Sequence, residues 1–530
     1  MFDILIKNGT VIDGSGRPMY RSDIAINEDR IVAMGDLAHA SAEKIIDATD
    51  HYVVPGFVDV NNHSDTYWQL LAEPELESLV RQGVTTIIGG NSGSSLAPLT
   101  TPKDIRSIQK WTDIEKINFN WLSMADFLKE IEKRVPAVNF ATLVGHGTIR
   151  RGAMKDETRN ITPDEIEIMR KFLKTALKEG AIGLSTGLKY THARGAGIRE
   201  ITSLVDTAKK NEGVYATYLR DEQENLVKAV EEALTVARET KASIHISHLK
   251  AVGEKNWPLM DEVFNLIETA ALNDIDVTFD VYPYTSTGSV LYTLLPEWIT
   301  QNGRKMMIER LKDPQTYDMV LRDMYQNEVN YSEVLISVST LSKMLSRKRI
   351  SDIAKIQGKK SEEVVLDFLL ASDGRAIVSQ EVLSERNVRK AIQHPFSIIS
   401  SNGVGYSIAH KESGDLLHPR NFGTFPKVLS EYVRKEKALS WEEAIHKMSG
   451  KPAVKFCLEK RGVIQEGYFA DIVIFHPEKI EDKATMEDPY QYPLGIHMVM
   501  VNGEVLLQDG VMNAKRSGRV LRSKKSFFGW

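Results

Sequence analysis

The sequence predicts a (β/α)₈ barrel joined to a small β-sandwich that both ends of the chain build together. Between residues 55 and 455, eight buried-strand patterns alternate with amphipathic helical patterns, which is typical of a parallel sheet with helical crossovers. On either side of that region, short segments alternate with period two, as antiparallel strands do. The chain has 530 residues, which is enough for both parts, because such a barrel takes about 250 residues or more.

The two β-rich ends are residues 1–54 and residues 456–530. In the first, Ile4–Lys7 and other short alternating segments are separated by turn residues. In the second, Phe469–Phe475 and His497–Gly503 have the same texture. Since the ends flank one long α/β region, we expect their strands to form a single sandwich.

The barrel is predicted to span residues 55–455, with an inserted helical lid at 286–347. The lid is predicted because residues 286–347 interrupt the strand–helix rhythm before the eighth strand. The predicted strands are Gly56–His63, Val84–Gly90, Asn139–Gly145, Ile182–Thr186, Val214–Arg220, Ser243–Lys250, Val277–Tyr284 and Phe396–Asn402.

The composition excludes several classes of function. The formal net charge of −5 gives no basic surface for nucleic acid. No apolar run approaches the ~20 residues that span a bilayer, so no membrane association is expected. Cys457 is the only cysteine, which rules out an internal disulfide. Together with the absence of a cleavable apolar leader, this predicts a cytoplasmic protein. The basic, aromatic tail after Gly518 is compatible with a surface arm or a contact in a homo-oligomer.

Polar side chains occur at the ends of all eight predicted strands. Because the carboxyl ends of barrel strands converge on one cavity, we expect these side chains to share a site for a small molecule. One representative from each strand end is His63, Ser92, His146, Tyr190, Tyr218, His248, Tyr282 and Asn402.

Longer ordered motifs cover nearly the whole chain. They are Lys7–Gly14, Pro55–Asp59, Gln82–Thr86, Ser95–Pro98, Gly180–Leu188, Ile246–Lys250, Asp280–Tyr284, Leu294–Trp298, His418–Pro426 and Arg461–Asp471. With these motifs in this order, the sequence resembles the D-aminoacylase (N-acyl-D-amino-acid deacylase) branch of the amidohydrolase superfamily. The resemblance implies an amidohydrolase-type barrel and an enzyme that acts on C–N bonds.

The resemblance also implies zinc, but this chain keeps few of the family's ligands. The family pattern has a His-x-His pair after strand one, a Cys after strand two, a His at the ends of strands five and six, and an Asp after strand eight. Only two of the matching positions still carry a metal-ligating side chain. The six positions read Asn61, His63, Ser92, Tyr218, His248 and Asn402.

This set predicts no bound cofactor and no metal. Zinc sites are built from thiolate, imidazole and carboxylate, whereas most of these side chains are neutral hydroxyls or amides. A harder ion would need carboxylates, and the nearest are Asp65, Asp280 and Glu222. The replacements are all polar, which favours altered chemistry over a disused cavity.

The substrate-holding part of the family's site is better preserved. The resemblance implies that Arg420, Lys250, Tyr190 and Tyr282 contact an N-acyl amino acid, and an Arg fork suits a carboxylate. We add to this binding set the remaining polar groups expected at the mouth, Asn402, Ser92, Asn61 and Ser289.

We expect catalysis to come from His63, His248, Lys250 and Tyr218. A buried lysine beside imidazoles can lose its proton and act as a base or a nucleophile, and a tyrosine can donate to an oxyanion. The leading hypothesis is metal-independent acid–base chemistry on an N-acyl amino acid or a related amide, by hydrolysis, acyl transfer or cyclisation. Two alternatives remain: a degenerate paralogue that binds a ligand or partner, and a zinc-dependent deacylase with a rebuilt site.

Overall fold

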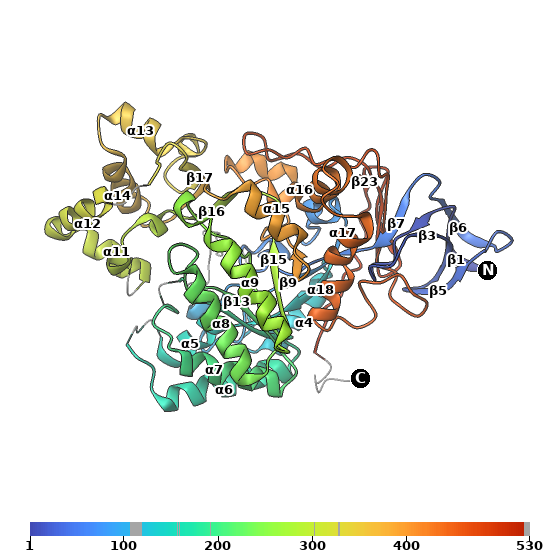
Figure 1. Ribbon diagram of the computed structural model, residues 1–530, viewed down its shortest axis with the longest axis horizontal. Coiled ribbons are helices and arrows are strands. Elements are labelled where there is room, and N and C mark those ends of the chain that lie inside the picture. The colour runs from blue at the N-terminus through green and yellow to red at the C-terminus, as the bar shows by residue number, and fades with distance from the viewer. Residues whose placement is uncertain are drawn as a thin grey trace.

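The computed structural model describes residues 1–105, 119–155, 157, 159–190, 192–300, 303–326 and 329–523. The last seven residues of the tail therefore lie outside the described residues. The predicted barrel is confirmed, and Figure 1 shows it at the centre of the molecule. Its strands are β8 (Phe57–Asp59), β9 (Val84–Gly89), β10 (Asn139–Thr142) continued by β11 (Val144–Gly145), β12 (Gly183–Gly187), β13 (Val214–Tyr218), β14 (Ile244–Ile246), β15 (Val277–Val281) and β19 (Ser397–Ile399).

The strands close into a ring through two arcs of parallel sheet. One arc has the order β10-β9-β8 and the other has the order β11-β12-β13-β14-β15-β19. The arcs meet at Leu143, the single residue between β10 and β11, and at a parallel bridge between Asn62 and Gly403. Most of the observed strands are shorter at their carboxyl ends than predicted, because the chain there leaves the ladder to form the loops of the barrel mouth, whereas β12 extends to Gly187 and β11 ends at Gly145 as predicted.

Amphipathic helices cover the outside of the barrel. Their apolar faces pack on the strands, as in α6, where Met169, Leu173 and Leu177 are buried. The start of α6 is set by a capping box between Thr162 and Glu165. The helices of this layer are α4 (Met124–Arg134), α5 (His146–Met154), α6 (Pro163–Lys178), α7 (Ile198–Lys210), α8 (Leu226–Thr240), α9 (Leu259–Leu272), α15 (Glu385–Gln393), α16 (Arg420–Lys427), α17 (Trp441–Met448) and α18 (Gly450–Lys455). Among the described residues, no helix is both long and apolar enough to span a membrane.

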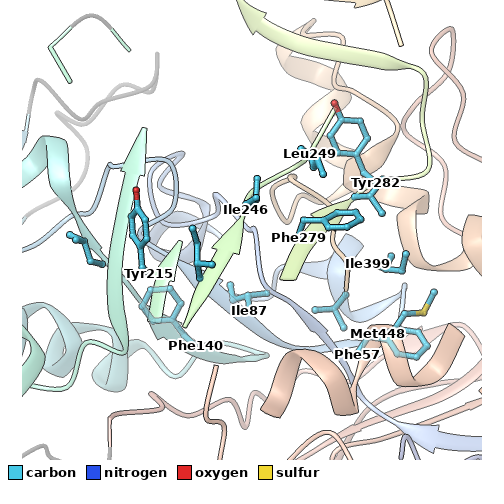
Figure 2. Packing of buried hydrophobic residues seen from close by; sticks show 14 of the residues in the cluster. Phe57, Ile87, Phe140, Tyr215, Ile246, Leu249, Phe279, Tyr282, Ile399 and Met448 are labelled. Atoms are coloured by element: carbon cyan, nitrogen blue, oxygen red, sulfur yellow. The ribbon is translucent and has the colours of Figure 1, made fainter. Parts of the chain in front are cut away.

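The main hydrophobic core lies between the strands and this helical layer. Figure 2 shows part of it, with Phe140, Tyr215 and Phe279 among the buried side chains. Ile399 and Met448 pack in the same cluster, which joins the last strand to α17. The core fixes the strands below the mouth, so the side chains that follow each strand start from a rigid base.

Two sheets at one end of the molecule form the predicted sandwich. One has the order β5-β4-β1-β6, and the other has the order β23-β22-β21-β20-β7-β2-β3, which mixes strands from both chain ends. A shared core that includes Ile24, Ile46 and Ile472 lies between the two sheets. The strands are β1 (Phe2–Lys7), β2 (Thr10–Val11), β3 (Tyr20–Arg21), β4 (Asp23–Asn27), β5 (Arg30–Gly35), β6 (Ala42–Asp47), β7 (Tyr52–Pro55), β20 (Ile472–Phe475), β21 (Ile496–Val501), β22 (Glu504–Gln508) and β23 (Val511–Met512).

The insertion forms a lobe on the opposite side of the barrel from the sandwich (Figure 1). It differs from the predicted helical lid, because it contains a three-stranded sheet and extends beyond residue 347. Strand β18 lies between β16 and β17, so the lobe needs residues up to 381 to complete its sheet and its own core. Its elements are β16 (Ser286–Val290), α10 (Glu297–Thr300), α11 (Gly303–Leu311), α12 (Pro314–Gln326), β17 (Leu335–Ser339), α13 (Ile350–Gln357), α14 (Ser361–Ala371) and β18 (Ala376–Glu381).

Candidate active site

Four polar side chains that follow β13 and β14 form a hydrogen-bonded group at the barrel mouth. We call Tyr218, Glu222, His248 and Lys250 the mouth cluster. The ammonium of Lys250 pairs with the Glu222 carboxylate and lies 3.0 Å from Nδ1 of His248. The Tyr218 hydroxyl donates to the other oxygen of Glu222 at 3.2 Å, and its ring meets the His248 ring edge to face at 4.4 Å. The cluster is therefore fixed by a central carboxylate.

The environment sets the protonation of each group. Burial alone would raise the pKa of the Glu222 carboxyl, but the positive charges of Lys250 and Lys189 outweigh it and hold that pKa well below its usual value. Burial and the adjacent Lys250 lower the pKa of His248, so its ring is neutral at pH 7. Burial and the Glu222 carboxylate raise the pKa of Tyr218 well above 10, so the phenol keeps its proton.

A second polar group lies at the ends of β8, β15 and β19. Nε2 of His63 is 2.9 Å from Oδ1 of Asn402. Asn61 donates to Asp280 at 3.3 Å, and Asp280 also accepts from Nε2 of His245 at 2.9 Å. Burial would raise the pKa of Asp280, but the hydrogen bond and charge of His245 lower it overall, so Asp280 is ionised at neutral pH.

Three site residues have left-handed backbone where the chain turns out of the barrel. Ser92, His248 and Asn402 have φ values of 54°, 38° and 46°. Asparagine and histidine are found in this conformation more often than other residues, whereas for serine it costs about 1–3 kcal/mol. The surrounding fold imposes this backbone, and it keeps the three side chains at the mouth.

Arg420 at the start of α16 is a cation without a partner among the described residues. Its Nε and Nη1 atoms are buried and donate to no acceptor there, and the Tyr282 hydroxyl has no hydrogen-bond partner there either. The guanidinium lies 5.3 Å from the centre of the Tyr282 ring. A Cβ atom on Gly288 of β16 would lie 3.6 Å from Nη2, so the lobe closes one side of this position. A half-buried guanidinium with unpartnered donor atoms suits an anionic ligand.

The mouth brings together most of the predicted site residues. Tyr190 stacks edge to face on Tyr218 at 5.5 Å, and its pKa is raised by burial. Ser92 lies beside the same loop, since its carbonyl would contact a Cβ on Gly187.

Three predicted residues have other surroundings. Ser289 accepts a hydrogen bond from Thr293 within the lobe, and its neighbour Gly288 is the residue that approaches Arg420. His146 instead pairs with Glu200 at 2.8 Å, beneath the loop that precedes α7. Lys250 does not stand beside imidazoles alone as expected, because a carboxylate pairs with it.

The central position of Glu222 could not be predicted from the sequence, which indicated this residue only as a possible ligand for a hard ion. The same holds for Lys189, whose ammonium lies 3.4 Å from Glu222. The only signal in the sequence was that Glu222 comes four residues after Tyr218, in the loop that follows β13. Tyr292 of the lobe was missed as well, although it influences the electrostatics of Tyr190. No local pattern connects the lobe to that loop.

Solved structures with similar folds cover almost all of this chain. A D-aminoacylase, solved in a study of its binuclear metal center, is 34% identical, has a TM-score of 0.83 and covers 99% of this chain and 100% of its own. An N-acyl-D-glutamate deacylase from Bordetella bronchiseptica is 28% identical with a TM-score of 0.84, covering 98% of this chain and 100% of its own. That protein was solved with zinc and a phosphonate inhibitor.

The residues present here do not fit such a metal centre. Within the described part of the chain, no three His, Cys, Asp or Glu side chains are placed to hold a metal ion. The available carboxylates are already engaged: Glu222 with two lysines, Asp280 with His245, and Asp65 with the backbone amides of Thr66 and Gly90. Ser92 and Tyr218 add only neutral hydroxyls, which are poor zinc ligands.

Whole-length similarity settles the family. The model of the amidohydrolase family matches residues 44–507. A D-aminoacylase from Alcaligenes xylosoxydans xylosoxydans is 35% identical over 98% of this chain and 97% of its own length. The chain therefore belongs to the amidohydrolase family and is an amidohydrolase-like enzyme.

Proposed function

We propose that this enzyme hydrolyses the amide bond of an N-acyl-D-amino acid. The observation that carries the proposal is the half-buried guanidinium of Arg420, which has two buried, unpartnered donor atoms beside the unpartnered hydroxyl of Tyr282. An N-acyl amino acid brings a carboxylate for the guanidinium and an amide for the mouth cluster. The names of the relatives, a D-aminoacylase and an N-acyl-D-glutamate deacylase, support this substrate class and the D configuration.

The proposed chemistry uses the protein's own groups, because the donor set does not suit zinc. In the neutral His248 ring, Nδ1 accepts from the Lys250 ammonium and the remaining proton is on Nε2. That N–H donates to the substrate carbonyl oxygen as negative charge develops there. The second imidazole at the mouth is His63, whose Nε2 lies 2.9 Å from Oδ1 of Asn402. Tyr218 and Glu222 hold Lys250 and His248 in position.

The proposed hydrolysis has two proton-transfer steps. In the proposed first step, the His63 imidazole takes a proton from a water molecule as the water oxygen forms a bond to the amide carbon. The same proton then passes to the amide nitrogen as the C–N bond breaks, which releases a carboxylic acid and a free amino acid. General acid–base catalysis of this type contributes about 10²–10⁴-fold.

The test combines elemental analysis with an activity assay. The protein would be dialysed against a chelator, its zinc content measured, and amine release from N-acetyl-D- and N-acetyl-L-amino acids followed. We expect activity to survive chelation, and kcat to fall at least ~10²-fold in His63→Ala and His248→Ala. The exposed His39 provides a matched control, since His39→Ala should leave kcat unchanged.

Each alternative outcome has a distinct meaning. Zinc retained at one per chain, with activity lost on chelation, would show that the metal-free chemistry is wrong while amide hydrolysis stands. Binding without turnover on a broad panel of N-acyl amino acids would instead favour a ligand-binding protein, because Arg420 can bind a carboxylate without any reaction.

A further inference from the structure

The barrel closes at the seam between β8 and β19, and a site residue follows each of these strands. The two strands are neighbours in the ring but belong to different sheets, although Figure 2 shows Phe57 of β8 and Ile399 of β19 in one core cluster. His63 follows β8, and Asn402 follows β19. In the turns that carry them, the backbone N–H of His63 donates to the Gly403 carbonyl at 2.8 Å. The seam thus lies directly beneath two groups of the candidate site.

The Asp59 carboxylate, at the carboxyl end of β8, bonds the backbone of the turn across the seam. Its Oδ1 accepts the backbone N–H of Ser401 at 2.9 Å, as a neighbouring strand would, and its Oδ2 accepts from the Ser401 hydroxyl. The oxygen of that hydroxyl accepts the Gly403 N–H at 2.9 Å. One carboxylate thereby fixes the backbone on both sides of Asn402.

The same carboxylate also holds the turn that carries His63. Its Oδ2 accepts from Nδ2 of Asn62 at 2.8 Å, and Oδ1 of Asn62 accepts the backbone N–H of Ser64 at 2.9 Å. These bonds fix the residues on either side of His63. Two turns that are more than 300 residues apart in the sequence therefore share one anchor, and their side chains meet where Nε2 of His63 lies 2.9 Å from Oδ1 of Asn402.

Asp59 acts from beneath the mouth, because its side chain is fully buried. Burial raises the pKa of its carboxyl to about 6, so the group is ionised at pH 7.5. An ionised carboxylate accepts hydrogen bonds at both oxygens, and the donors of Ser401 and Asn62 occupy both. A buried charge is stable only when it is bonded in this way, and the two turns depend on it in return.

We propose that Asp59 is a positioning residue for His63, because its carboxylate sets the placement of that imidazole against Asn402. The inference rests on the proposed function, in which His63 takes a proton from water. A displacement of about 1 Å in a reacting group can cost about 10²-fold in rate. Substrate binding depends on Asp59 much less, because Arg420 and Tyr282 belong to α16 and to the end of β15.

The test replaces Asp59 by asparagine. Asp59→Asn keeps the size of the side chain but places an NH₂ group against a donor in either orientation. We expect kcat for an N-acetyl-D-amino acid at pH 7.5 to fall at least about tenfold, with KM within about twofold. Asp13 provides a matched control, since it follows β2 of the sandwich, is 1% exposed and accepts from the backbone N–H and the hydroxyl of Ser15. Asp13→Asn should leave kcat unchanged.

A double variant and an NMR measurement separate positioning from a general loss of structure. Once the imidazole is removed in His63→Ala, adding Asp59→Asn should lower kcat by less than about twofold. In labelled protein, the histidine resonances of His63 are assigned by their absence in His63→Ala, and they should shift in Asp59→Asn. A fall in kcat of the same size in the His63→Ala background, or His63 resonances that stay in place, would overturn the proposal.

The positioning and the reaction can fail separately. If wild type shows no turnover but Asp59→Asn shifts the His63 resonances, the positioning stands and the proposed reaction is wrong. If wild type turns over and Asp59→Asn has the same kcat, the reaction stands and the positioning is wrong.

A second variant applies if Asp59→Asn does not fold. Asn62→Ala keeps the carboxylate and its bonds to Ser401, and removes only the link to the turn of His63. It should lower kcat about threefold or more, with a shift of the His63 resonances. Unchanged kcat and unchanged resonances in Asn62→Ala would overturn the proposal.

Discussion

Two buried lysines lie at opposite ends of the barrel and have very different surroundings. Lys250, at the mouth, pairs with the Glu222 carboxylate. Lys447, at the amino end of β19, is 4% exposed and donates only to neutral acceptors, the His394 carbonyl and the Ser397 hydroxyl. Burial, with a smaller effect from Lys451, lowers the pKa of Lys447 from 10.5 to about 7. A carboxylate thus balances the charge of Lys250 at the mouth. Lys447, at the opposite end of the barrel, has no such partner and loses its proton readily.

The largest expected effect on stability comes from removing the carboxylate of Glu222, which balances the charge of Lys250 at the mouth. Glu222→Gln leaves the Lys250 ammonium buried without its counter-charge, and breaking a buried pair in this way costs about 3–5 kcal/mol of the free energy of unfolding. Urea unfolding measures the loss. The double variant with Lys250→Met should recover much of it, and a loss below about 1 kcal/mol in Glu222→Gln would contradict the central role of this carboxylate.

Arg420 sharpens the comparison, because it is a cation at the mouth that lacks a carboxylate of its own. We expect the ligand to supply it. Arg420→Ala should weaken the binding of an N-acyl amino acid by about 1.5–3 kcal/mol, which is at least tenfold, measured by calorimetry. Arg420→Lys should recover only part of the affinity, since an ammonium lacks the two-pronged geometry of the guanidinium. Equal affinity in wild type and both variants would show that the Arg420 guanidinium does not bind the ligand.

The lowered pKa of Lys447 predicts that the stability of the fold depends on pH. Between pH 7 and 10.5 the unfolded chain binds a proton that folded Lys447 has released, so this residue makes the free energy of unfolding rise with pH. The rise between pH 7 and pH 8 is about 1 kcal/mol. Lys447→Met should flatten the stability profile by that amount in this interval, as followed by urea unfolding at several pH values. Parallel profiles for wild type and variant would mean that Lys447 stays charged in the fold.

The smallest effect on stability is expected at an exposed ion pair whose charged atoms are about as close as those of the pair at the mouth. Arg194, in the loop before α7, lies 2.6 Å from Glu297 of the lobe, and the two side chains are 30% and 53% exposed. Solvent screens such a pair, so Arg194→Ala should change the free energy of unfolding by about 0–1 kcal/mol. A loss approaching that of Glu222→Gln would show that burial is not what distinguishes the mouth.

The barrel could be predicted from the sequence because its strands are short apolar runs separated by helical patterns. The prediction overextended the strand at Gly56–His63, for example, since periodicity does not reveal where hydrogen bonding ends and a mouth loop begins. The lobe was placed at the correct starting point but was cut short. Its strand β18 pairs with β16 across about 90 residues, and a pairing over that distance has no local signature.

The sequence could predict which residues lie at the candidate site, but not which of their side chains contact one another. His63, His248 and Arg420 were found because each follows a strand or stands in a motif. The pairing of Lys250 with Glu222 depends on side chains from two neighbouring strands turning toward each other, which only the folded barrel determines. For the same reason, the sequence indicated a lysine among imidazoles and did not reveal the carboxylate between them.

The mixed sheet of the sandwich has a consequence for synthesis on the ribosome. β7 pairs with β20, about 420 residues later in the chain, and at ~5–20 residues per second this delay lasts roughly 20–80 s. Throughout that interval β7 has an open edge toward its missing partner, and such an edge can pair with another chain. A nascent chain that stalls inside the barrel would therefore be exposed to aggregation, and chaperones that shield strand edges should matter more for this protein's yield than for its stability once complete.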